Sequence, residues 1–195
     1  MQRLGESRAA PLIAVALAMA LTAVCFRQTA SAGTVEYVSQ GTPIFRFDVP
    51  DDWQFRIGPD VPAAEMPEGI TPAPRVISVR PPGEDGVMWT GLWSPPGVED
   101  FAEAREYLRR LGPRLVDGPQ VGYRDERSVN GRPARIFSGT GTRMGREFDF
   151  VFAAVQIAPG RIAVAAFIGE PGIFDRYEAQ LVDLLDSVKP AEAVR

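Results

Sequence analysis

Two neighbouring aspartates, Asp51 and Asp52, are the first candidates for chemistry, because carboxylates can act as general acids and bases. A pair of carboxylates can also hydrolyse a glycosidic bond, and Glu147 or Asp149 could supply a second group if the fold brought it close. However, Pro50 precedes the two aspartates, and aspartate is common where a strand turns because its side chain bonds to the nearby backbone. We therefore interpret them as a turn and keep a carboxylate-based glycan hydrolase as an alternative.

Three tryptophans are the candidate ligand-binding residues. Trp89 and Trp93 share one face of an alternating run with Gly91 between them, a pattern that can form a flat platform for a lipid tail, a sugar or a peptide. Trp53, which follows the aspartate turn, is the third candidate. Large aromatic residues on strands are also typical of a buried core, so packing is the competing interpretation.

Several kinds of site lack the residues they need. The chain has no histidine, and its one cysteine, Cys25, lies in an N-terminal segment that we expect to be removed. Without these residues the mature chain cannot use thiolate or imidazole metal ligands, or a nucleophile activated by histidine. The glycine-rich residues 138–145 match no phosphate-binding motif, so we expect them to end one hairpin arm and begin the next. We predict no metal, no cofactor and no enzymatic activity.

The first 32 residues have the features of a secretory signal peptide: a charged start, an apolar run at residues 11–26 and an A-x-A site that ends at Ala32. The apolar run is shorter than the roughly 20 residues that cross a bilayer, so an uncleaved anchor is a weaker alternative. Lipidation at Cys25 is weaker still, because a bulky valine precedes it. We expect cleavage near Ala32 and a periplasmic or secreted domain at residues 33–195.

The length and charge of the chain limit its class. The net charge is −4, and loss of the N-terminal segment makes the chain more acidic because that segment is rich in arginine. Nucleic acids and anionic membranes require a concentrated basic face, so we predict no nucleic-acid partner and membrane contact only through an uncleaved signal segment. The mature chain is long enough for one domain with one core.

The elements that position these residues are mostly strands. In the stretch IFRFDVPDDW the side chains of Phe45, Phe47 and Val49 share an apolar face, and Asn130-Gly131 predicts a tight hairpin. The two strands at residues 147–157 and 162–168 are apolar on both faces, so helices must cover each side. We expect about seven or eight strands, which lie at residues 44–49, 53–57, 75–79, 87–93, 123–129, 133–140, 147–157 and 162–168, with a short strand possible at 34–38.

Two helices are expected. Asp100 can cap the first, Glu103 occupies the capping-box position, and Gly112-Pro113 is expected to end it. Its arginines, which include Arg105 and Arg109, are explained by pairing with Glu106 on a solvated face. An apolar stripe at residues 174–188 predicts the second helix, which Lys189-Pro190 ends. This order predicts an α+β fold in which a central antiparallel sheet of about six to eight strands is flanked by helices, an α/β/α sandwich.

The order and spacing of these motifs resemble the PsbP-like superfamily, which also contains a fungal Ran-binding import factor and many bacterial exported domains of unknown function. The resemblance rests on FRFDVPDDW, DFAEAREYLRRL, VNGRPARIFSGTG, the two long apolar strands and FDRYEAQLVDLLDSVKP, which cover most of residues 44–190. It implies a central antiparallel sheet flanked by helices, and a family that mostly binds partners rather than catalysing. It supplies no catalytic motif.

These observations favour an exported, non-enzymatic binding or accessory domain that contacts a protein or an envelope component. The contact is expected on one sheet face or on the proline-rich loop at residues 58–74. The glycan hydrolase remains one alternative. A carrier of lipids or small hydrophobic molecules is another, and it requires an internal apolar cavity of at least several hundred Å³.

Overall fold

The computed structural model of the chain describes residues 33–60, 73–84 and 86–192. The expected signal peptide and most of the proline-rich loop therefore lie outside the described residues. In chain order the elements are β1 (Thr34–Ser39), β2 (Thr42–Asp48), β3 (Gln54–Ile57), β4 (Ile77–Arg80), β5 (Met88–Trp93), α1 (Phe101–Leu115), β6 (Asp117–Val129), β7 (Arg132–Arg143), β8 (Arg146–Ala158), β9 (Arg161–Gly169), α2 (Ile173–Asp186) and β10 (Lys189–Pro190).

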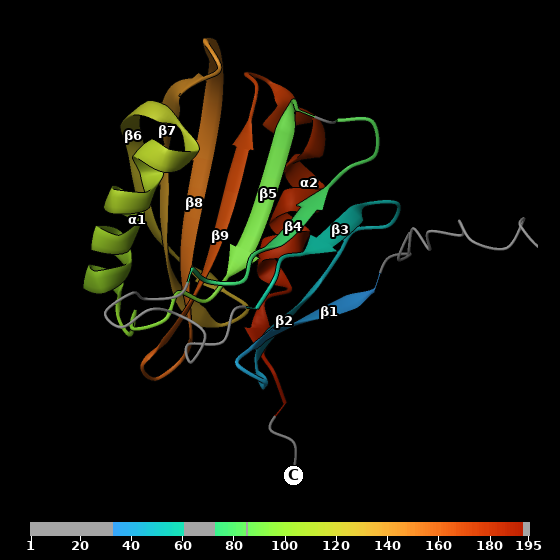
Figure 1. The fold of residues 1–195 in the computed structure, drawn as a ribbon, viewed down its shortest axis with the longest axis vertical. Helices are drawn as coiled ribbons and strands as arrows, with labels where there is room; N and C mark the ends of the chain where they lie inside the picture. Colours follow the sequence, from blue (N-terminus) through green and yellow to red (C-terminus); the bar gives the residue numbers. More distant parts are fainter. Residues whose placement is uncertain (1–32, 61–72, 85, 193–195) are drawn as a thin grey trace, which may run out of the picture.

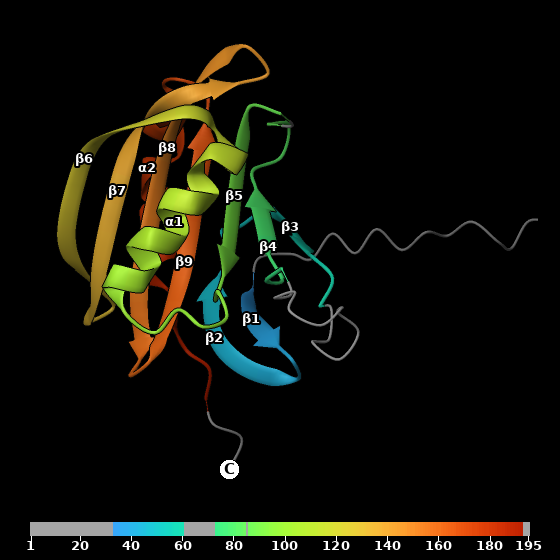
Figure 2. The ribbon, with the colours of Figure 1, turned by 60° about the vertical axis from the view of Figure 1, so that its left-hand side comes forward.

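A seven-stranded antiparallel sheet forms the centre of the molecule, in the order β3-β4-β5-β9-β8-β7-β6. Helix α1 lies across one face of this sheet and α2 lies on the opposite face (Figures 1 and 2). The strands β8 and β9 are buried along most of their length, as their two apolar faces predict. The structure confirms the α+β class and the helix on each face. No helix in the described part of the chain is both long enough and apolar enough to span a membrane.

The opening motif joins two different sheets. Phe45, Phe47 and Val49 are buried, as their alternation predicts. Strand β2 pairs with β1 and β10 in a separate three-stranded sheet, whereas β3 belongs to the large sheet. The turn between them has Asp52 in the left-handed region at φ 66°. The sequence did not predict the separate sheet, because the third strand of that sheet comes from the far end of the chain.

Helix α1 begins where its cap predicts and ends later than expected. The Asp100 carboxylate accepts hydrogen bonds from the backbone N–H groups of Ala102 (2.8 Å) and Glu103 (2.9 Å). The predicted stop at Gly112-Pro113 is wrong, since the helix continues to Leu115. Proline removes one backbone donor, but so close to the helix end only a single intrahelical hydrogen bond is lost.

The predicted tight turns are confirmed by backbone angles. Asn130 and Gly131 have φ of 48° and 73°, as a type I′ hairpin between β6 and β7 requires. The glycine-rich stretch ends β7, and a second turn at Met144-Gly145 leads into β8. The C-terminal helix differs from its prediction: it ends at Asp186, before the Lys189–Pro190 segment that forms β10 beside β2.

Candidate functional site

The structure places two of the three candidate tryptophans in the core. Trp53 is 4% exposed and meets the ring of Tyr177 edge-on at 5.6 Å. Trp93 is 2% exposed, and its indole N–H donates to the Tyr107 hydroxyl of α1 at 3.0 Å. Trp89 is half-buried, and its indole N–H donates to Ser78 Oγ at 3.3 Å. The three indoles therefore do not form one common surface. A ligand role for them stays a prediction, and Trp89 is the most accessible of the three.

Gly91 provides the space that the neighbouring indole occupies. A Cβ atom at this position would lie 2.4 Å from Cη2 of Trp89. The ring of Trp89 therefore covers the backbone of Gly91.

We expect Tyr107→Phe to lower the free energy of unfolding at neutral pH by about 1 to 3 kcal/mol, because the buried Trp93 N–H loses its acceptor. Burial raises the pKa of Tyr107, and the hydrogen bond from Trp93 partly offsets this rise. The stabilisation from the neutral phenol is therefore complete below the unfolded pKa of about 10 and is lost as the pH rises through the higher folded pKa.

Urea unfolding measured at neutral pH and above about pH 10 checks this prediction. The variant should lose less stability on alkalinisation than the wild type, although burial also raises the pKa of Tyr37 and so some loss should remain. Tyr123→Phe removes an exposed hydroxyl and is the control at neutral pH, where it should change the free energy of unfolding little. Equal effects of the two substitutions at neutral pH would contradict the role given to the Trp93 hydrogen bond.

The carboxylates of the hydrolase alternative lie on different parts of the molecule. Asp51 and Asp52 are exposed in the turn between β2 and β3. Glu147 and Asp149 line a pocket at the start of β8 with Asp117, and neither aspartate of the turn lines that pocket. Among residues 33–60, 73–84 and 86–192, no three potential ligand side chains are grouped to hold a metal ion.

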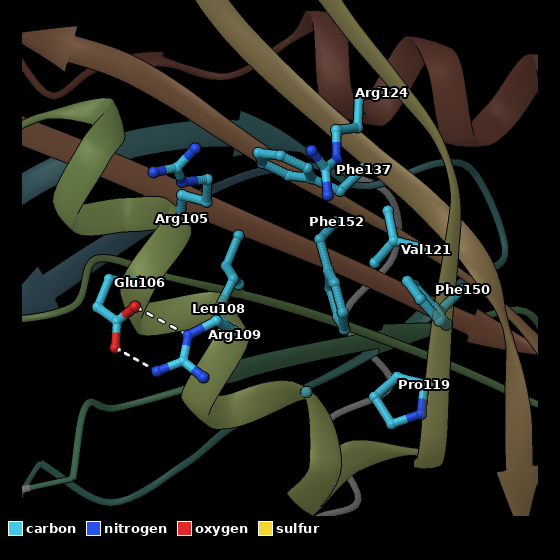
Figure 3. A pocket seen from close by; sticks show the side chains of 11 residues that line it. Arg105, Glu106, Leu108, Arg109, Pro119, Val121, Arg124, Phe137, Phe150 and Phe152 are labelled. Carbon is cyan, nitrogen blue, oxygen red and sulfur yellow. Dashed lines mark hydrogen bonds and ion pairs between the residues drawn. The ribbon is translucent and has the colours of Figure 1, made fainter.

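The best-formed pocket lies between α1 and the strands β6, β7 and β8, and its cavity volume is about 370 Å³ (Figure 3). Phe137, Phe150 and Phe152 supply aromatic side chains from the sheet, and Leu108 faces them from α1. Val121 of β6 forms part of the wall and is 47% exposed. We call this space the α1 groove. It is an apolar site of the size that small ligands occupy.

Two glycines of β7 allow the first part of β6, and Val116 just before it, to lie close against β7, and β6 forms one wall of the α1 groove. A Cβ atom on Gly139 would lie 1.9 Å from the carbonyl oxygen of Gln120 and 2.9 Å from the ring of Phe150. A Cβ atom on Gly141 would lie 2.4 Å from Cγ1 of Val116. Register shifts in β6 beside these contacts bend the strand. The Gly-Thr-Gly sequence at residues 139–141, which the sequence pattern predicts as part of a hairpin arm, thus also shapes the pocket.

Arginines give one end of the α1 groove a positive charge. Arg105 of α1 and Arg124 of β6 lie at the same end, with the ring of Phe137 between them (Figure 3). Within the described part of the chain, neither guanidinium makes a hydrogen bond or an ion pair. Arg105 is exposed, as the predicted solvated helix face requires, and its charge adds to the larger effect of Arg109 in lowering the pKa of Glu106.

The third arginine of the groove is already neutralised. Arg109 donates to both carboxylate oxygens of Glu106, at 2.9 Å from Nε and 2.8 Å from Nη2 (Figure 3). These hydrogen bonds lower the pKa of Glu106 and raise the pKa of Arg109. The predicted pairing on the helix face is confirmed here. The available positive charge of the groove thus comes from Arg105 and Arg124.

No known protein-family profile matches this chain, and no curated protein matches it by sequence. Among solved structures it is similar to PsbP from the cyanobacterium Synechocystis, with 12% identity, a TM-score of 0.49 and coverage of 88% of this chain and 99% of that one. It is also similar to LpqN, described as involved in cell envelope biogenesis of Mycobacterium tuberculosis, with 16% identity, a TM-score of 0.49 and coverage of 83% and 92%.

A protein of unknown function from Pseudomonas aeruginosa is a further match, with 12% identity, a TM-score of 0.45 and coverage of 82% of this chain and 99% of that one. A PsbP is thus among the matches, as the sequence resemblance predicts. At these identities and TM-scores the matches do not indicate what this chain binds.

Proposed function

We propose that this protein is an exported, non-enzymatic binding domain that holds an apolar ligand, or the apolar part of an envelope component, in the α1 groove. The observation that carries the proposal is an apolar cavity of about 370 Å³ between α1 and one face of the sheet. Its volume reaches the several hundred Å³ that a carrier of small hydrophobic molecules requires, but the site is a groove with the half-exposed Val121 in its wall and not the internal cavity of the carrier hypothesis.

Burial of apolar surface between a ligand and the groove supplies the affinity. Phe150 and Phe152 are 1% and 5% exposed and have little surface left to bury, whereas Val121 on the wall is 47% exposed. Apolar surface that is removed from water contributes roughly 25 cal/mol per Å², so the affinity comes mainly from the ligand's own chain and from Val121, without a covalent or catalytic step.

Filling the α1 groove tests the proposal. Val121→Trp places a large side chain at a half-exposed wall position, where the core need not rearrange. We expect binding of the neutral fluorescent probe 1-N-phenylnaphthylamine to weaken by about tenfold or more, because loss of about 1.4 kcal/mol of contact is a tenfold change. Fluorescence titration of wild type and variant measures the effect.

Tyr123→Trp is the matched control, since Tyr123 is 57% exposed on the same strand and does not line this groove. It should leave probe binding unchanged. If the wild type does not bind the probe, or if both variants weaken binding equally, the groove is not the binding site.

Export is the part of the proposal that rests on sequence alone. It is supported by the charged start, the apolar run and the cleavage site within residues 1–32. N-terminal sequencing of the protein recovered from its native host tests it: a first residue near Gly33 supports export, and an intact N-terminus in the cytoplasmic fraction contradicts it.

A further inference from the structure

We infer that the ligand of the α1 groove is a single-chain fatty acid whose carboxylate lies at the end of the groove that carries Arg105 and Arg124 and whose chain extends along the phenylalanines. This inference rests on the proposed function and adds the chemistry of the ligand. It is drawn from three features of the groove: two exposed arginines at one end that make no hydrogen bond or ion pair with the described residues, an apolar interior, and a volume that suits one chain.

The charge at the open end favours an anion. Arg105 and Arg124 come from different elements, α1 and β6, and both line the α1 groove and the pocket that adjoins it. Neither has a hydrogen-bond or ion-pair partner among the residues that the structure describes, whereas Arg109, Arg127 and Arg135 each pair with a carboxylate. The planar donors of a guanidinium group match the two oxygens of a carboxylate, so an anion at this end of the groove can be bound by either arginine.

The rest of the groove favours a hydrocarbon chain over a polar ligand. Beyond the arginines the wall is formed by Val121 and Pro119 from β6 and by Leu108 from α1, and the Glu106–Arg109 pair is internally satisfied. A sugar or a peptide backbone would leave its hydrogen-bonding groups without partners against these side chains, which is costly. An alkyl chain has no such groups.

The volume limits the length of the chain. If a methylene group occupies about as much space as a water molecule, roughly 30 Å³, the cavity of about 370 Å³ accommodates a chain of about ten to twelve carbons. A phospholipid with two long chains would exceed this space. We therefore choose decanoate as the probe, with decanol as a neutral molecule of the same chain length.

The experiment compares these two ligands by displacement of 1-N-phenylnaphthylamine at about pH 8, where the carboxyl group of decanoate is ionised. We expect the wild type to bind decanoate about tenfold or more tightly than decanol, since hydrogen bonds to a charged group add affinity. The double substitution Arg105→Gln with Arg124→Gln should remove this preference, by weakening the binding of decanoate far more than that of decanol.

Arg110→Gln is the control, because Arg110 is an exposed arginine of the same helix that does not line the α1 groove. It should keep the preference for decanoate, and circular dichroism should show that all variants are folded. Equal affinity for the two ligands in the wild type, or a preference that survives the double substitution, overturns the carboxylate site but not the groove. Failure of both ligands to bind the wild type overturns this inference and the proposed function together.

Discussion

Phe45→Ala is expected to lower the free energy of unfolding by about 3 to 5 kcal/mol, the range for removal of a fully buried phenylalanine. Phe45 has no exposed surface, and its ring stacks on Tyr37 with a centroid distance of 4.7 Å and an angle of 9° between the planes. The ring of Phe47 lies 6.1 Å away on the same face of β2. Deletion of the ring leaves a cavity that these two neighbours can fill only in part. Urea unfolding, followed by circular dichroism, measures the change.

Phe55→Ala is the matched control, since Phe55 is only partly buried in the edge strand β3. Phe55→Ala should lower the free energy of unfolding clearly less than Phe45→Ala does. Less buried apolar surface is lost at Phe55, and the space left by its ring opens to water. Equal losses for both variants would mean that the small sheet is not packed on the core as the structure shows.

Gly139→Ala should lower the free energy of unfolding by about 1 to 3 kcal/mol, as overpacking of a close contact does. The new Cβ atom would lie 1.9 Å from the carbonyl oxygen of Gln120, which belongs to the backbone and cannot move aside by a side-chain rotation. The first part of β6 must therefore separate from β7. Because β6 forms one wall of the α1 groove, binding of 1-N-phenylnaphthylamine should weaken in the same variant.

Gly122→Ala supplies the comparison for this effect. Gly122 lies in β6 itself, and a Cβ atom there would meet no other atom within 4 Å. This variant should keep its probe binding and its stability to within about 0.5 kcal/mol, as substitutions in open space do. Loss of probe binding in both variants, or in neither, would contradict the role assigned to the contact between Gly139 and Gln120.

Local rules in the sequence predicted the parts of the fold that depend on neighbouring residues. Asn130-Gly131 forms its hairpin because both residues tolerate the positive φ of a type I′ turn. Asp100 caps α1 because its carboxylate reaches the first free N–H groups of the helix. The alternation of Phe45 and Phe47 correctly predicted the buried face of β2.

Features that depend on distant residues were missed. The separate sheet needs β10 to pair with β2, and no local pattern in either strand specifies that partner. The α1 groove depends on the space left between α1 and the sheet, which is set by the approach of β6 to Gly139 and Gly141. The alternating phenylalanines at Phe150 and Phe152 were visible in the sequence, but alternation cannot distinguish a packed core from the floor of a pocket.

The pairing of β10 with β2 sets the order in which the small sheet forms as the chain emerges N-terminus first. The hairpin of β1 and β2 can form as soon as its residues have emerged, but its third strand arrives only after α2. The backbone N–H of Ala191 then donates to the carbonyl oxygen of Ile44 at 3.1 Å. Contacts so distant in sequence form late because loop closure is costly. Until then one edge of β2 stays unpaired, and a nascent chain is most open to chaperones or to wrong strand pairing at that edge.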